Sequence, residues 1–123
     1  MITNPIKLGE KLEKGEDNLK LEWSFGKKIS DIKEIEKKEW SMASTGIEMA
    51  IQTMKERNIG GLLFSPIIFT TIITTSASSL VLGMSITKTA VMIGVGGRGI
   101  DTLNKIRRYK LISKGNYYIL KKT

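Results

Sequence analysis

The chain has 123 residues, 20 Lys/Arg against 12 Asp/Glu, and no histidine or cysteine. This length suits one domain, and the two missing residue types exclude disulfides, thiolate nucleophiles, imidazole metal ligands and the commonest general base. The whole net charge of +8 belongs to residues 58–123, because residues 1–57 carry equal numbers of acidic and basic side chains. We therefore expect a non-enzymatic protein with no catalytic, cofactor or metal site, whose second half meets an anionic partner.

The first part of the chain is polar. Residues 1–17 contain Pro5, Gly9 and Gly15, a composition that predicts a loop or an extended arm. The basic and then apolar stretches of a secretory signal are missing from this start, so we expect no export by that route. Residues 19–25 alternate strictly between apolar and polar side chains, which predicts a strand with one buried face. Such a strand needs a partner, in this chain or in a neighbouring copy.

A long amphipathic helix is predicted for residues 31–57. Ser30 occupies the position of an N-cap, apolar residues then recur at steps of three and four, and we expect a bend near Gly46. Glutamates and lysines alternate on the other side, which is typical of a solvated surface and not of paired catalytic carboxylates. The side chains expected to be buried are Trp40, Ala43, Ile47, Ile51 and Met54.

The next segment is distinctive because no charged residue occurs from Asn58 to Thr87. About 20 apolar residues suffice for a helix to cross a bilayer. Pro66 and eight hydroxyls between Ser65 and Ser79 nevertheless weaken insertion. Six of the hydroxyl side chains recur four residues apart and predict a helix-packing face, namely Thr70, Thr71, Thr74, Thr75, Ser78 and Ser79. A membrane and a protein interface both remain open as the surroundings of this segment.

Residues 94–99 read Gly-Val-Gly-Gly-Arg-Gly. Glycines of this density suggest a phosphate-binding loop, but the spacing fits neither the P-loop nor the dinucleotide-binding pattern. We expect a flexible joint or close helix packing there instead.

The last segment is a basic tail. A short helix with Leu103 and Ile106 is predicted after Asp101, and two strand-like runs flank Lys114-Gly115 as in a β-hairpin. Three tyrosines lie among the basic residues, a combination that occurs in nucleic-acid-binding proteins and also at membrane surfaces. The candidate contacts with an anionic surface are Lys105, Arg107, Arg108, Lys110, Lys114, Lys121 and Lys122.

These segments predict a mainly α fold, in which an amphipathic helix and an apolar helix or helical hairpin accompany a short N-terminal strand and a small C-terminal β-hairpin. Four regions follow one another: a polar arm at 1–17, a strand and amphipathic helix at 18–57, an uncharged helical segment at 58–100 and the basic tail at 101–123.

Three functional hypotheses fit this layout. The leading one is a non-enzymatic structural component of a multi-subunit assembly, a virion protein, which buries its apolar middle against other copies, other subunits or a membrane. The second is a small holin-like or pore-forming membrane protein, in which helices at 62–82 and 86–100 form a hairpin in the lipid. The third is a protein that packages nucleic acid by contacts between the tail and the phosphate backbone, without sequence specificity.

Overall fold

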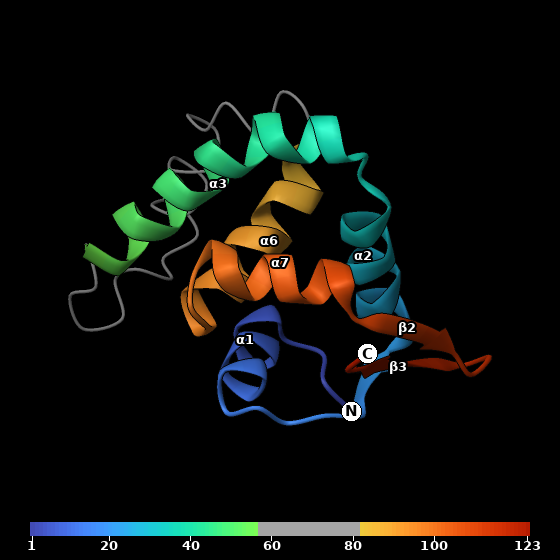
Figure 1. The fold of residues 1–123 in the computed structure, drawn as a ribbon. Coiled ribbons are helices and arrows are strands. Elements are labelled where there is room, and N and C mark those ends of the chain that lie inside the picture. Colours follow the sequence, from blue (N-terminus) through green and yellow to red (C-terminus); the bar gives the residue numbers. More distant parts are fainter. Residues whose placement is uncertain (57–81) are drawn as a thin grey trace.

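The computed structural model describes residues 1–56 and 82–123 (Figure 1). Within these two ranges the chain is mainly helical, so the predicted fold class is confirmed. The helices are α1 (Pro5–Glu13), α2 (Trp23–Glu34), α3 (Lys37–Glu56), α6 (Met84–Gly96) and α7 (Ile100–Arg108). The strands are β1 (Leu19–Glu22), β2 (Lys110–Ser113) and β3 (Tyr117–Lys121).

The three strands form one antiparallel sheet in the order β1-β3-β2. β2 and β3 are the predicted C-terminal hairpin, and β1 pairs with β3 in a register that aligns Leu19 with Leu120. The N-terminal strand therefore finds its partner in this chain, at the opposite end of the sequence. Ile2 adds a single parallel bridge to Leu21, which places the first residues of the chain beside β1.

The helical part is built around α6, which packs against α1, α2, α3 and α7. Figure 1 shows α6 behind α7, with α3 above it and α1 below it. The helices α1 and α6 approach closely through glycines. A Cβ atom on Gly9 would lie 2.1 Å from the carbonyl oxygen of Ile93, and one on Gly96 would lie 2.1 Å from that of Ile6. Close helix packing is thus the role of the glycine-rich segment.

The prediction of a polar arm at residues 1–17 is wrong in its central part, where α1 forms. The side chain of Asn4 accepts hydrogen bonds from two backbone N–H groups of the first turn, and Pro5 stands at the first helical position. Leu8 and Leu12 are buried, and their spacing of four places them on one helical face. Asn-Pro followed by this pair is itself a helix-start signal, which the glycines obscured.

The strand predicted at 19–25 is too long, because it ends at Glu22 and α2 begins at the next residue. The carboxylate of Glu22 accepts hydrogen bonds from two backbone N–H groups and caps α2. Phe25, Ile29 and Ile32 are buried at steps of four and three. The helical period therefore starts inside the run that alternates like a strand, and the cap decides where the strand ends.

The predicted continuous helix at 31–57 is divided into two. α2 ends at Glu34 and α3 begins at Lys37, so the break lies well before Gly46. Ser30 is not an N-cap but lies inside α2, where its hydroxyl is 3.3 Å from a carboxylate oxygen of Glu34. The break coincides with backbone carbonyl groups that accept hydrogen bonds from an arginine of α7.

The buried face predicted for this amphipathic segment is confirmed, and α3 carries it. None of its members exposes more than 7% of its surface, and Ala43, Ile47 and Met54 are fully buried. On the outer side of the same helix, Met42 and Met49 remain 63% and 64% exposed. The three- and four-residue spacing therefore located the face that packs on the core.

The predictions for the uncharged segment fall mostly outside the described residues. This applies to the first helix of the proposed membrane hairpin and to the hydroxyl face of Thr70, Thr71, Thr74, Thr75, Ser78 and Ser79. The returning arm at 86–100 is not one helix, because α6 ends at Gly96 and α7 begins at Ile100. Within residues 1–56 and 82–123, no helix is both long and apolar enough to cross a bilayer.

Candidate anion-binding surface

The inner face of the sheet belongs to the core. Leu19, Leu21 and Leu120 are buried there. Tyr118 lies on the same face and stacks on Trp23 of α2, with ring centroids 4.9 Å apart and an interplanar angle of 22°. α2 therefore covers this side of the sheet, and successive residues of each strand point to the opposite side.

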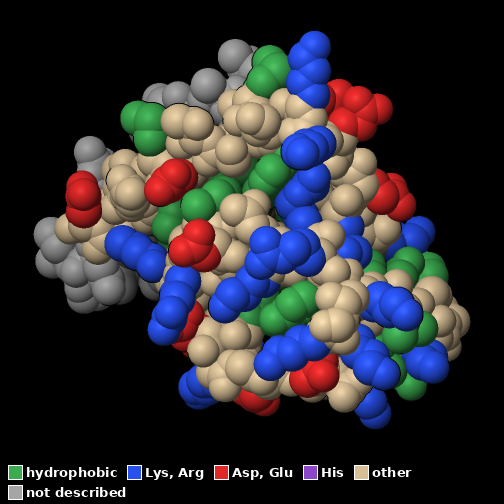
Figure 2. Space-filling view, viewed as in Figure 1, with side chains coloured by type: hydrophobic (Ala, Val, Ile, Leu, Met, Phe, Trp, Pro, Cys, Tyr) green, Lys and Arg blue, Asp and Glu red, His purple; other side chains and the backbone are tan. Residues whose placement is uncertain are grey.

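The opposite side is called the open sheet face. Its members follow from the strand register and are Lys20, Glu22, Lys110, Ile112, Tyr117, Ile119 and Lys121. None of them is buried: the three lysines are exposed and the other four residues are partly exposed. Figure 2 shows Lys and Arg side chains interleaved with hydrophobic ones over the β2–β3 hairpin, at the lower right of the view.

The net charge of the open sheet face is positive because it carries three lysines and one carboxylate, that of Glu22. The Glu22 oxygens lie 3.0 Å and 3.1 Å from the backbone nitrogens of Ser24 and Phe25. These hydrogen bonds to the charged form lower the pKa of Glu22. The ammonium of Lys20 lies 5.7 Å from the ring centroid of Tyr117, so this lysine contacts an aromatic face. The sheet thus presents three lysines, one tyrosine and two isoleucines.

Arg107, one of the predicted anion contacts, makes hydrogen bonds within the chain. Its guanidinium donates hydrogen bonds of 2.6 Å and 2.8 Å to the carbonyl oxygens of Ile32 and Ile35 at the end of α2. It also lies 4.6 Å from the ring centroid of Trp40. The cation therefore joins the end of α2 to the start of α3, and desolvation by burial lowers the pKa of Arg107.

Lys33 makes the reciprocal contact from α2 to α7. Its ammonium donates to the carbonyl oxygens of Ile106 and Arg107, each at 3.2 Å, and to that of Tyr109. Lys33 thus lies at the C-terminal end of α7, and Arg107 lies at the C-terminal end of α2. The helix dipole favours positive charge at both places. Burial, and then the charge of Arg107, lower the pKa of Lys33.

Lys122 is also engaged within the chain. Its ammonium donates to the carbonyl oxygen of Gly15 at 2.7 Å, and its backbone N–H donates to the carboxylate of Asp17 at 2.8 Å. The hydrogen bond from Lys122 and a second one from the backbone of Asn18 lower the pKa of Asp17. Lys122 therefore fastens the C-terminal end to the turn before β1.

The other predicted contacts remain on the surface. Lys110 and Lys121 belong to the open sheet face, where their strand positions are paired. Arg108 and Lys114 are exposed, and Lys105 is partly exposed. The structure thus brings two of the seven predicted residues together on the sheet, leaves three on α7 and in the hairpin turn, and assigns two to internal contacts.

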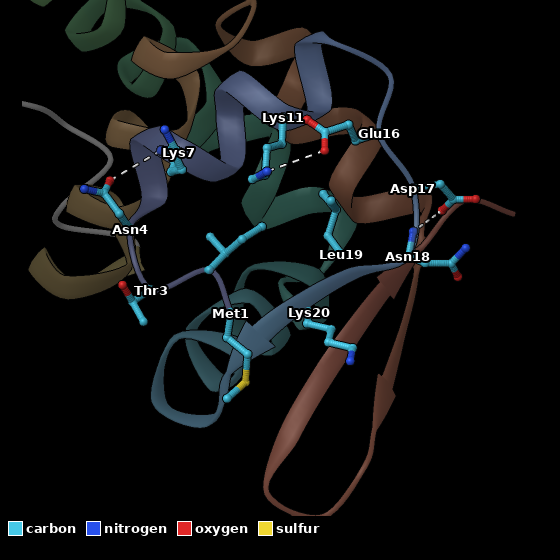
Figure 3. Close-up of a pocket in the computed structure, with 11 residues that line it drawn as sticks. Met1, Thr3, Asn4, Lys7, Lys11, Glu16, Asp17, Asn18, Leu19 and Lys20 are labelled. Carbon is cyan, nitrogen blue, oxygen red and sulfur yellow. Dashed lines mark hydrogen bonds and ion pairs between the residues drawn. The ribbon is translucent and has the colours of Figure 1, made fainter.

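A cleft of ≈ 420 Å³ lies beside β1 and is bounded by the first residues of the chain and by α1 (Figure 3). Lys7, Lys11 and Lys20 line it. Lys11 forms an ion pair with Glu16, with 3.4 Å between the charged atoms. Lys20 is shared with the open sheet face, so the cleft continues that face past the edge of β1.

Lys20 is the functional candidate that sequence reasoning missed. It lies in the charge-balanced half of the chain, and only its pairing with β3 places it next to the basic tail. Its place on the polar side of the alternating run was the available signal. In the part of the chain that the structure describes, no three acidic side chains gather into a group that could hold a metal ion.

No protein-family model matches this chain, and comparisons with curated proteins and with solved structures found no similar protein.

Proposed function

We propose that this protein is a non-enzymatic nucleic-acid-packaging protein, which holds the phosphate backbone on the open sheet face and on the exposed basic residues beside it. The observation that carries this proposal is the position of Lys20, Lys110 and Lys121 on one exposed face. The carboxylate of Glu22, the only acid on that face, is engaged in capping α2. A surface on which lysines outnumber carboxylates attracts a polyanion at long range.

This proposal fits the structure better than a membrane hairpin or an assembly held together by an unpaired strand. The apolar residues of α6, such as Val91 and Ile93, are buried against helices of the same chain. The strand β1 is paired within the chain as well. The sequence suggested a partner through the strand at 19–25, the uncharged segment and the one-sided charge. Of these, the one-sided charge is the feature that the described residues leave on the surface.

Binding of this kind depends on counterion release and carries no base preference. Each phosphate that a lysine neutralises lowers the slope of log affinity against log salt concentration by about 0.7 for single strands and about 0.9 for duplexes. The open sheet face supplies three such lysines. Affinity should therefore fall steeply between about 50 and 200 mM salt, and equally for sequences of different composition.

The test compares two triple variants with the same loss of charge. Lys20, Lys110 and Lys121 are changed to Gln in one, and the exposed Lys14, Lys37 and Lys38 are changed to Gln in the other. Binding to labelled oligonucleotides is measured by fluorescence anisotropy at several salt concentrations. We expect the first variant to lose affinity and about two units of salt slope, and the second variant to bind like the parent protein.

Equal loss in both variants would show a general effect of net charge and would contradict the proposed surface. A parallel sedimentation experiment with anionic and neutral lipid vesicles addresses the membrane hypothesis. If lipid headgroups were the partner, each basic residue near an anionic leaflet would contribute about 1 kcal/mol. Binding to anionic vesicles but to no oligonucleotide would refute the proposal.

A further inference from the structure

The open sheet face contains more than charge, since Tyr117 and two isoleucines lie among its lysines. Tyr118, the next residue, stacks on Trp23, whereas Tyr117 is partly exposed and the ammonium of Lys20 lies over its ring. Ile119 follows two residues later on the same face, with Ile112 directly beside it on β2. The two isoleucines therefore lie between the aromatic ring of Tyr117 at one end of the face and the pair Lys110 and Lys121 at the other end.

This combination distinguishes between forms of nucleic acid. A duplex keeps its bases stacked inside and presents phosphates, which need the lysines but leave the tyrosine and isoleucines without a partner. A single strand presents phosphates together with base faces, and stacking of a base on an aromatic side chain is favourable for every base. Three strands spaced about 4.8 Å apart give a face about 10 Å wide, which suits one or two bases.

We propose that the open sheet face binds single-stranded nucleic acid, with one base stacked on Tyr117 and phosphates farther along the same strand held by Lys20, Lys110 and Lys121. This inference rests on the proposed function and specifies the form of its ligand. Lys20 now lies 5.7 Å from the centroid of the tyrosine ring. Because its side chain is exposed, its ammonium can move to a phosphate when a base takes its place on the ring.

The negative charge of the neighbouring carboxylate is partly offset by the N-terminus of a helix. Glu22 is the strand partner of Tyr117, and a free carboxylate there would repel phosphate. Its oxygens instead accept hydrogen bonds from Ser24 and Phe25, so its charge is directed at the first turn of α2. Base stacking therefore takes place beside a carboxylate that helix capping already stabilises.

The experiment measures, with the full chain, the anisotropy of labelled oligo(dT), oligo(rU) and a duplex with half as many base pairs, which has the same number of phosphates. We expect single strands to bind more tightly than the duplex at equal phosphate number. Tyr117→Leu should weaken single-strand binding about ten-fold or more, whereas Tyr117→Phe, which keeps the aromatic face, should stay within about three-fold of the parent. Neither substitution should change duplex binding. The two single-stranded arms identify the preferred polymer, and tight binding of either supports the proposal.

A second readout does not depend on a variant that folds. The ring proton resonances of Tyr117 in the parent protein should shift upfield on addition of oligo(dT), as expected for a ring stacked beneath a base. If oligonucleotides bind, but duplex and single strand bind equally and Tyr117→Leu matches the parent, base stacking is refuted while backbone binding stands. If no oligonucleotide binds at all, both proposals fail.

Discussion

Replacement of Arg107 by Ala tests the reciprocal contact between α2 and α7. The guanidinium donates to the carbonyl oxygens of Ile32 and Ile35 at 2.6 Å and 2.8 Å and lies 4.6 Å from the ring centroid of Trp40. In the variant the two carbonyl groups lose a charged donor, and the tryptophan loses the cation that covers it. We expect the protein to fold but to be clearly less stable.

The magnitude follows from the three contacts. Hydrogen bonds to a charged group contribute about 1.5 to 3 kcal/mol each when they are fully buried, and a cation near an aromatic ring adds about 0.5 to 1 kcal/mol. Two effects reduce this sum: Arg107 is partly exposed, and its removal relieves repulsion with Lys33. We therefore expect a loss of about 2 to 3 kcal/mol in the free energy of unfolding. For a domain of this size the melting temperature should fall by about 10 °C.

The assay is thermal and urea unfolding followed by circular dichroism, with Arg108→Ala as the matched control. Arg108 is the neighbouring residue on the same helix, carries the same charge and is exposed. Its loss should change stability by less than about 0.5 kcal/mol. Arg107→Lys keeps the charge without the planar fork and should lie between the two. Equal melting temperatures for the alanine variants at 107 and 108 would refute the structural role of the guanidinium.

Four further substitutions test the packing of the core and the titration of Lys33. Gly9→Ala should lower the free energy of unfolding by more than about 2 kcal/mol, because the added Cβ would lie 2.1 Å from the Ile93 carbonyl oxygen. This loss exceeds the gain of about 1 kcal/mol that Ala brings to an isolated helix. A variant that is more stable in urea unfolding would exclude that close approach. Ile47→Asp should cost several kcal/mol, since Ile47 is fully buried. Met49→Asp, on the 64% exposed side of the same helix, should cost little, and similar urea midpoints for the two would contradict the buried face. Burial and a nearby guanidinium lower the pKa of Lys33 below 10.5, so the folded state binds this proton less tightly than the unfolded state. The stability of the parent relative to Lys33→Gln should therefore rise as the pH increases through the lowered pKa towards 10.5. A difference that stays flat or falls in urea titrations over this range would count against the lowered pKa of the partly buried ammonium.

Local patterns in the sequence were sufficient for the elements whose pattern and packing agree. The buried face of α3 follows from apolar residues at steps of three and four, because the side of a helix that carries them must turn to the core. The hairpin of β2 and β3 follows from the Lys114-Gly115 turn, where Gly115 has a φ of +90° that glycine adopts without strain. Two of the predicted basic contacts, Lys110 and Lys121, lie on the open sheet face for the same local reason.

The rest was decided by contacts between distant parts of the chain. Residues 27–45 contain no glycine or proline, so no local signal marks the break between α2 and α3. The break lies where Arg107, which is distant in the sequence, donates hydrogen bonds to two carbonyl groups at the end of α2. Likewise, Lys20 reaches the basic tail only because β1 pairs with β3. Hydrogen bonds and strand pairs of this kind join residues that are distant in the sequence, and no periodic pattern marks them. They decide which charged side chains are used within the fold and which stay on the surface.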